Sequence, residues 1–224
     1  AFWEAADRLE KAEDFETAVH DLIKEYMTEH QRIIFNGNGY SDEWVVEAEK
    51  RGLPNIKSMI EAASTLTSEK AVALFEKFGI YTKAELESRE EIIYETYAKT
   101  INIEALTMID MAGKQIIPAV VKYTKTLGDT ANAIKAAGGD ASVQTELLAD
   151  VSTKLAAMQK ELNKLVADEK EASAMEDVKA QAFFYKDTIK ATMDELRKPA
   201  DELEMIVDKD VWPIPTYGEL MFEV

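Results

Sequence analysis

The sequence of 224 residues contains no cysteine, fewer basic than acidic residues and no long hydrophobic run. The lack of cysteine excludes disulfide bonds and thiolate metal sites, which fits a cytoplasmic protein. Acidic residues outnumber basic ones by 43 to 26, and the net charge of −17 argues against binding to nucleic acid or to anionic membranes. The longest apolar run, Ile116 to Val121, is far shorter than the roughly 20 residues that span a bilayer. The acidic residues that follow Ala1 do not fit a secretory leader.

Much of the remaining sequence is typical of long helices, and one early stretch interrupts this pattern. Two glycines separated by one asparagine are expected to take positive φ values, so that the backbone reverses sharply after Phe35. A serine cap then predicts a short helix, which a glycine followed by a proline ends. The residues that define this predicted structural turn are Asn36, Gly37, Asn38, Gly39, Ser41, Gly52 and Pro54.

Short helices fill the rest of the first third of the chain. Apolar spacing and helix-breaking residues predict helices over 4–12, 15–34, 42–51, 56–63 and 68–78. From Thr82 the pattern changes, because Thr82 and Glu85 form a capping box that begins a helix reaching at least to 127. Pro118 lies inside this helix and removes a backbone donor, which predicts a kink near 114–118.

Two further long helices, over 141–170 and 173–207, carry apolar residues at alternating spacings of three and four. Long helices joined by short turns pack antiparallel. We therefore expect an all-α fold in which long antiparallel helices form a bundle. Several short helices would occupy the N-terminal third, with an extended tail at the C-terminus. The expected regions, making one compact unit, are 1–81 (short helices), 82–210 (bundle) and 211–224 (tail).

The C-terminal tail is too apolar to stay in water, and Pro213 and Pro215 prevent a regular helix at its start. We expect it to dock either in a groove of this chain, beside the turn, or on a missing domain or neighbouring subunit. The residues expected to dock are Trp212, Ile214, Tyr217 and Phe222.

The sequence offers few candidates for catalytic or metal-binding residues. His20 and His30 lie ten residues apart, so they are not an i,i+4 pair of metal ligands. The clustered carboxylates are interleaved with lysines, which is typical of solvated helix faces. No phosphate loop, dinucleotide fingerprint or Ser/His/Asp set can be assembled. The sequence therefore predicts no catalytic, cofactor-binding or metal-binding residue in this chain.

Four segments nevertheless resemble the C-terminal region of type III glutamine synthetases. They are Phe35–Trp44, Glu47–Asn55, Lys99–Thr107 and Trp212–Val224, and they follow the order of that family. The resemblance implies a parent enzyme that joins ammonia to glutamate with ATP and Mg²⁺ or Mn²⁺. It further implies partners: an upstream catalytic domain and neighbouring subunits of a ring-shaped homo-oligomer. In that family the catalytic machinery lies upstream of these residues, so the fragment would be a non-catalytic assembly domain.

Two alternatives stay open at this point. Glutamine synthetases have a substrate loop, Asn-Gly-Ser-Gly, with a histidine one residue further on, and Ser41 stands at that histidine's position here. This difference favours a structural turn at Asn36–Gly39 over a loop that contacts a ligand. For the whole chain, the alternative to an enzyme domain is a free-standing helical scaffold that binds other helices.

Overall fold

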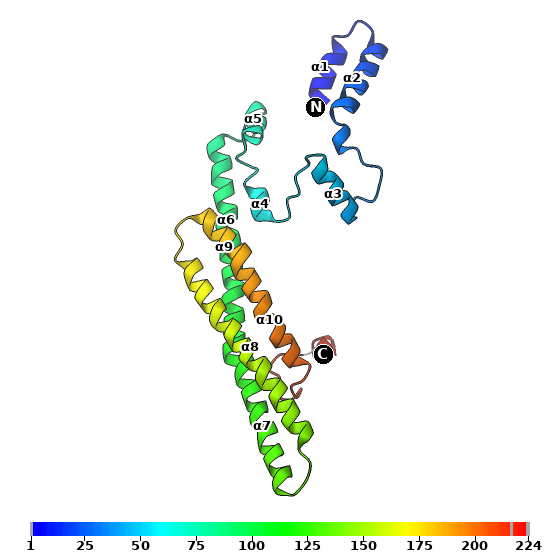
Figure 1. Ribbon diagram of the computed structural model, residues 1–224. Helices are drawn as coiled ribbons and strands as arrows, with labels where there is room; N and C mark the ends of the chain where they lie inside the picture. Colours follow the sequence, from blue (N-terminus) through cyan, green and yellow to red (C-terminus); the bar gives the residue numbers. More distant parts are fainter. Residues whose placement is uncertain (1, 216, 223–224) are drawn as a thin grey trace. The chain divides into compact units, whose positions relative to one another are not determined.

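The computed structural model describes residues 2–215 and 217–222, and every regular element within these ranges is helical (Figure 1). The expected all-α fold with long helices packed together is confirmed. Contacts divide the chain into two units, one ending at Met59 and the other beginning at Ile60. The sequence predicted a change of character at Thr82 instead. The difference arises because the segment after Ile60 packs against the first long helix.

The first unit contains helices α1 (Phe2–Glu10), α2 (Phe15–Glu29) and α3 (Asp42–Lys50), with a 3₁₀ turn, η1, at Gln31–Ile33. Helices α1 and α2 form a hairpin, in which the two terminal guanidinium nitrogens of Arg8, Nη1 and Nη2, donate to the Glu25 carboxylate at 2.8 and 2.7 Å. The sequence predicted a helix that reaches residue 34. In the structure α2 ends at Glu29, and the chain continues through the 3₁₀ turn η1.

The second unit contains the bundle and the elements attached to it. Its helices are α4 (Met59–Ala63, beginning at the boundary), α5 (Glu69–Lys77), α6 (Lys83–Met111), α7 (Ile117–Ala136), α8 (Ser142–Ser173), α9 (Val178–Phe184), α10 (Lys190–Glu204) and α11 (Tyr217–Phe222). Two π-helical segments, η2 (Ala112–Ile116) and η3 (Tyr185–Ile189), join α6 to α7 and α9 to α10. Figure 1 shows α8 returning alongside α6 and α7, and α10 returning alongside α8.

Most apolar residues of the two predicted seams are buried in the bundle interior, and the rest, Leu148, Leu155, Val178 and Ile206, are half-buried. On α8 the side chains of Val151, Met158 and Leu165 are fully buried. They belong to one core with side chains of the returning helix, Tyr185, Ile189, Leu196 and Leu203. This placement confirms the seams read from spacings of three and four residues.

The long helix interrupted by Pro118 contains a π-helical turn just before the proline. Pro118 has no N–H for the carbonyl of Lys114, and its ring would clash with that carbonyl in a regular helix. The chain widens by one residue, so that the N–H of Ile117 donates to the carbonyl oxygen of Ala112. The second π-helical segment, at Tyr185–Ile189, has no proline nearby and the sequence did not predict it.

Caps determine where the helices begin and end. The capping box of Thr82 and Glu85 is present, as predicted. The third long helix begins at Val178 and not near 173, because the Asp177 carboxylate accepts the N–H of Ala180 at 2.7 Å and fixes the start there. At their C-terminal ends, α3, α5 and α7 are followed by glycines with positive φ, namely Gly52, Gly79 and Gly138.

Two glycines, one just after α7 and one inside it, permit a testable comparison. Gly138, with φ of 79°, ends the helix, and Gly128 lies within it, where an added Cβ would make an ordinary contact with Leu148 at 3.9 Å. We expect Gly138→Ala to lower the free energy of unfolding by about 1 kcal/mol, because an L-residue is strained there. Gly128→Ala should raise it by about 0.5–1 kcal/mol through helix propensity. Urea unfolding measures the change in the free energy of unfolding for both variants. Changes of the same sign would contradict the interpretation that Gly138, unlike Gly128, is needed for its positive φ.

Candidate functional site

The turn at residues 36–39 does not form in the way the sequence suggested. Neither Gly37 nor Gly39 has a positive φ, so the expectation that they reverse the chain in that conformation is wrong. The side chain of Asn38 makes the turn instead, because its Oδ1 accepts the N–H of Tyr40 at 3.0 Å. Ser41 caps α3 as predicted, since its hydroxyl accepts the N–H of Trp44.

The conformation of this segment depends on an aromatic pair that the sequence reading missed. The rings of Phe35 and Trp44 stack with centroids 4.2 Å apart, and the guanidinium of Arg51 lies 5.6 Å from the Trp44 ring. Arg51 also donates to the carbonyl oxygen of Ile34 at 2.8 Å. A Cβ on Gly37 would come within 2.5 Å of the far end of the Phe35 ring, so a larger residue there would require that ring to shift. The spacing of Trp44 and Arg51 could have indicated this contact, because residues seven apart, about two helical turns, lie on the same side of a helix and Arg51 directly follows α3.

The end of α3 follows the prediction for Gly52 and Pro54. Gly52 has φ of 70°, and the N–H of Leu53 donates to the carbonyl oxygen of Ala48 at 2.9 Å. This hydrogen bond and the left-handed glycine form a Schellman motif, which terminates the helix before Pro54. The segment is thus a packed corner in which aromatic, cationic and backbone groups satisfy one another.

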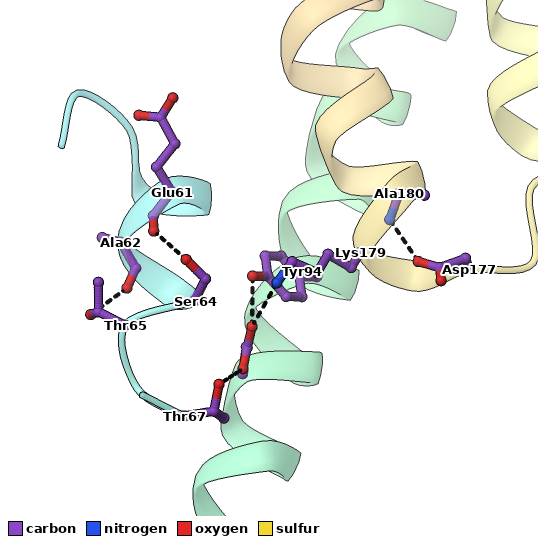
Figure 2. A network of polar contacts seen from close by, with 10 residues as sticks. Glu61, Ala62, Ser64, Thr65, Thr67, Tyr94, Asp177, Lys179 and Ala180 are labelled. Carbon is purple, nitrogen blue, oxygen red and sulfur yellow. Dashed lines mark hydrogen bonds and ion pairs between the residues drawn. The ribbon is translucent and has the colours of Figure 1, made fainter. Parts of the chain in front are cut away.

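A second polar cluster lies where the loop after α4 meets α6 and α9 (Figure 2). Its centre is the Glu90 carboxylate, whose side chain is only 12% exposed. The hydroxyls of Thr67 and Tyr94 donate to it at 2.6 and 2.7 Å, and the Lys179 ammonium lies 3.5 Å away. These partners come from three different parts of the chain, so the cluster ties the loop, α6 and α9 together.

The electrostatics of this cluster follow from its partial burial. Burial by itself would raise the pKa of the Glu90 carboxyl, but the hydrogen bonds from Thr67 and Tyr94 and the Lys179 charge outweigh it and lower the pKa. Burial, followed by the hydrogen bond to Glu90, raises the pKa of the Tyr94 phenol. The pair is therefore a neutral phenol donating to a charged carboxylate at neutral pH.

Apolar packing beside the Glu90 cluster attaches α4 to the bundle. Ile60 and Ala63 from α4 are buried with Tyr94 from α6 and Ala182 from α9. Outside this small core, the Lys186 ammonium binds the Glu61 carboxylate at 3.0 Å. The residues after Ile60 are thereby held to the bundle by both apolar and charged contacts.

The C-terminal tail packs only in part. Val211, Trp212 and Ile214 lie against the main bundle core and are half-buried. Phe222 is 78% exposed, so it does not dock on the described part of this chain. The reason is that α11 is six residues long, and three consecutive apolar residues on it point in different directions. The side chain of Tyr217 lies outside the described residues.

The polar side chains described above offer few possibilities for metal binding or catalysis. His20 and His30 are exposed, and within residues 2–215 and 217–222 no three His, Asp or Glu side chains are arranged to hold a metal ion. A hollow of about 470 Å³ beside Glu90 is lined mainly by acidic side chains, with Lys179 as its cation. Among the residues described, no helix is long and apolar enough to cross a membrane. The geometry thus defines a helical domain whose polar groups mainly stabilise packing.

Comparison with known proteins identifies the family to which this helical domain is similar. Residues 18–135 match the family described as "Glutamine synthetase C-terminal domain". The chain is 39% identical over 214 residues to a glutamine synthetase of Butyrivibrio fibrisolvens. It is 33% identical over 218 residues to a type-3 glutamine synthetase of Dictyostelium discoideum. A glutamine synthetase of Bacteroides fragilis (strain YCH46) is 30% identical over 211 residues.

Because the family match extends over more than half of the sequence, the chain belongs to the glutamine synthetase C-terminal domain family. The resemblance noted from the four segments is confirmed. The first two alignments each cover 95% of this chain and the third covers 92%. They cover only 31%, 30% and 29% of the relatives, so the chain spans about a third of their length.

The role of Glu90 can be tested with substitutions that differ in charge and in size. At neutral pH, Glu90→Ala should lower the free energy of unfolding by about 1–3 kcal/mol, because it leaves the Thr67 and Tyr94 hydroxyls without their acceptor. Glu87, a glutamate on the same helix with an exposed side chain, is the matched control. We expect Glu87→Ala to change stability by less than about 0.5 kcal/mol.

The pH dependence provides a second readout for the same carboxylate. A lowered pKa means that ionised Glu90 stabilises the fold above its ordinary value of 4.5, and that this contribution is lost as the pH falls through the lowered value. The stability advantage of the wild type over Glu90→Gln should therefore shrink as the pH falls from 6 to about 3. An advantage that stays constant over this range, measured by chemical unfolding, would contradict the ionised cluster.

Proposed function

We propose that this chain is the C-terminal helical domain of a longer glutamate–ammonia ligase and that it serves assembly without doing chemistry itself. The observation that carries the proposal is the family match, combined with relatives that are about three times as long as the aligned region. By resemblance, the longer protein joins ammonia to glutamate with ATP in the cytoplasm.

The donor groups of this chain support placing the chemistry elsewhere. ATP-dependent ligation needs carboxylates gathered around Mg²⁺ or Mn²⁺ and groups that hold phosphates. The described residues offer no such metal-binding set, and Glu90, the most buried of the carboxylates around the acidic hollow, is already engaged by Thr67, Tyr94 and Lys179. The residues present thus do not fit the metal ions, and we assign those ions and ATP to the preceding part of the protein.

The partners in this proposal are an upstream catalytic domain and neighbouring subunits in a ring-shaped homo-oligomer. Exposed apolar residues support a role in assembly, because isolated helical domains rarely leave so many in water. The coding sequence before Ala1 distinguishes this proposal from a free-standing scaffold. A long segment with glutamate metal ligands and an Asn-Gly-Ser-Gly loop supports the ligase domain. A stop codon or an unrelated domain supports the scaffold.

An activity assay tests the non-catalytic role directly. We expect the purified 224-residue chain, supplied with glutamate, ammonia, ATP and Mg²⁺ or Mn²⁺, to form no glutamine above the background rate. The full-length protein, assayed in parallel, should turn over and thereby shows that the assay works. Glutamine formation by the isolated chain would overturn the proposal.

A further inference from the structure

The first unit exposes an unusual amount of apolar surface. Within residues 2–59 only Leu22 is buried, with 8% of its surface exposed. The large apolar side chains that lie exposed there are Phe2, Trp3, Phe15, Ile23, Met27, Ile33, Tyr40, Val45, Val46, Ile56 and Met59. The second unit, in contrast, encloses a continuous core. Residues 2–59 therefore leave most of their large apolar side chains in contact with solvent.

These side chains are partly organised in rows. On α2, Phe15, Val19, Ile23 and Met27 follow one another at intervals of four residues, so they form a stripe along one side of the helix. Three of them are exposed and Val19 is half-buried. Leu22 lies on the neighbouring side of the same helix, which leaves the stripe uncovered by α1. An apolar stripe of this kind is typical of a helix that packs against a partner.

The energetics indicate that this surface is covered in the functional protein. A unit of fewer than 60 residues with one buried side chain buries too little apolar area to offset the entropy of ordering its backbone. The stacked Phe35 and Trp44 rings and the Arg8–Glu25 ion pair add local order. Exposed ion pairs stabilise a fold only weakly, so these contacts do not replace a core.

We propose that the exposed apolar surface of residues 2–59 binds the part of the polypeptide that precedes this chain. This inference rests on the proposed function, in which the chain is the C-terminal part of a protein about three times as long. The preceding part would then be joined at α1, where Phe2 and Trp3 are 95% and 62% exposed. Covalent attachment keeps that partner at a high effective concentration, so the surface is covered without a second chain.

Methionine oxidation tests the proposal without any substitution. Met27 lies in the α2 stripe with 54% of its surface exposed, Met158 is fully buried in the bundle, and Met205 is 85% exposed. Hydrogen peroxide oxidises accessible methionines faster than buried ones. The rate at each residue is measured by peptide mass spectrometry, in the 224-residue chain and in the full-length protein, over a range of protein concentrations.

We expect Met27 to be oxidised about tenfold more slowly in the full-length protein than in the isolated chain, at every concentration. Met158 should stay slow and Met205 fast in both, which calibrates the reagent. Equal rates at Met27 would overturn the proposal, and so would an equal slowing of Met205. Protection of Met27 that grows with the concentration of the isolated chain or of the full-length protein would assign the surface to a second copy instead. Glutamine formation by the full-length protein is scored separately, so a failure of the proposed function remains distinguishable.

Discussion

The rest of the structure depends on the buried apolar seam between α8 and α10. Val151, Met158 and Leu165 meet the buried side chains of the returning helix there, and the seam continues onto α6 and α7. Burying each large side chain contributes about 1.5–3 kcal/mol, far more than any exposed ion pair on these helices. The many lysine–carboxylate pairs one turn apart on the outer faces therefore maintain solubility more than they determine the fold.

The loop and helices that follow Ile60 attach to this bundle through a different combination of forces. Ile60 and Ala63 supply the apolar contact. The Glu90 carboxylate accepts a hydrogen bond from the Thr67 hydroxyl in the loop and pairs with the Lys179 ammonium on α9. Partial burial makes such hydrogen bonds stronger than they would be in water and makes their loss costly. The position of α4 is thus determined by contacts far apart in sequence.

The bundle could be predicted from the sequence because its determinants are local. Spacings of three and four residues identified the buried faces, and Thr82 with Glu85 identified the start of α6. The Glu90 cluster could not be predicted, because Thr67 and Lys179 lie 23 and 89 residues away from it. At the turn, glycine suggested positive φ, whereas Gly37 has no positive φ and lies close against the Phe35 ring. A pattern of residue types does not distinguish these two situations.

Residues 60–215 enclose a core of their own, whereas residues 2–59 bury only Leu22 and are proposed to depend on a partner. Native-state hydrogen exchange on the 224-residue chain tests this most directly. We expect the amides of α8 and α10 to exchange only through global unfolding, and the amides of α1, α2 and α3 to exchange at least about a hundredfold faster. Similar protection in both units would contradict the account, because residues 2–59 would then be stable alone.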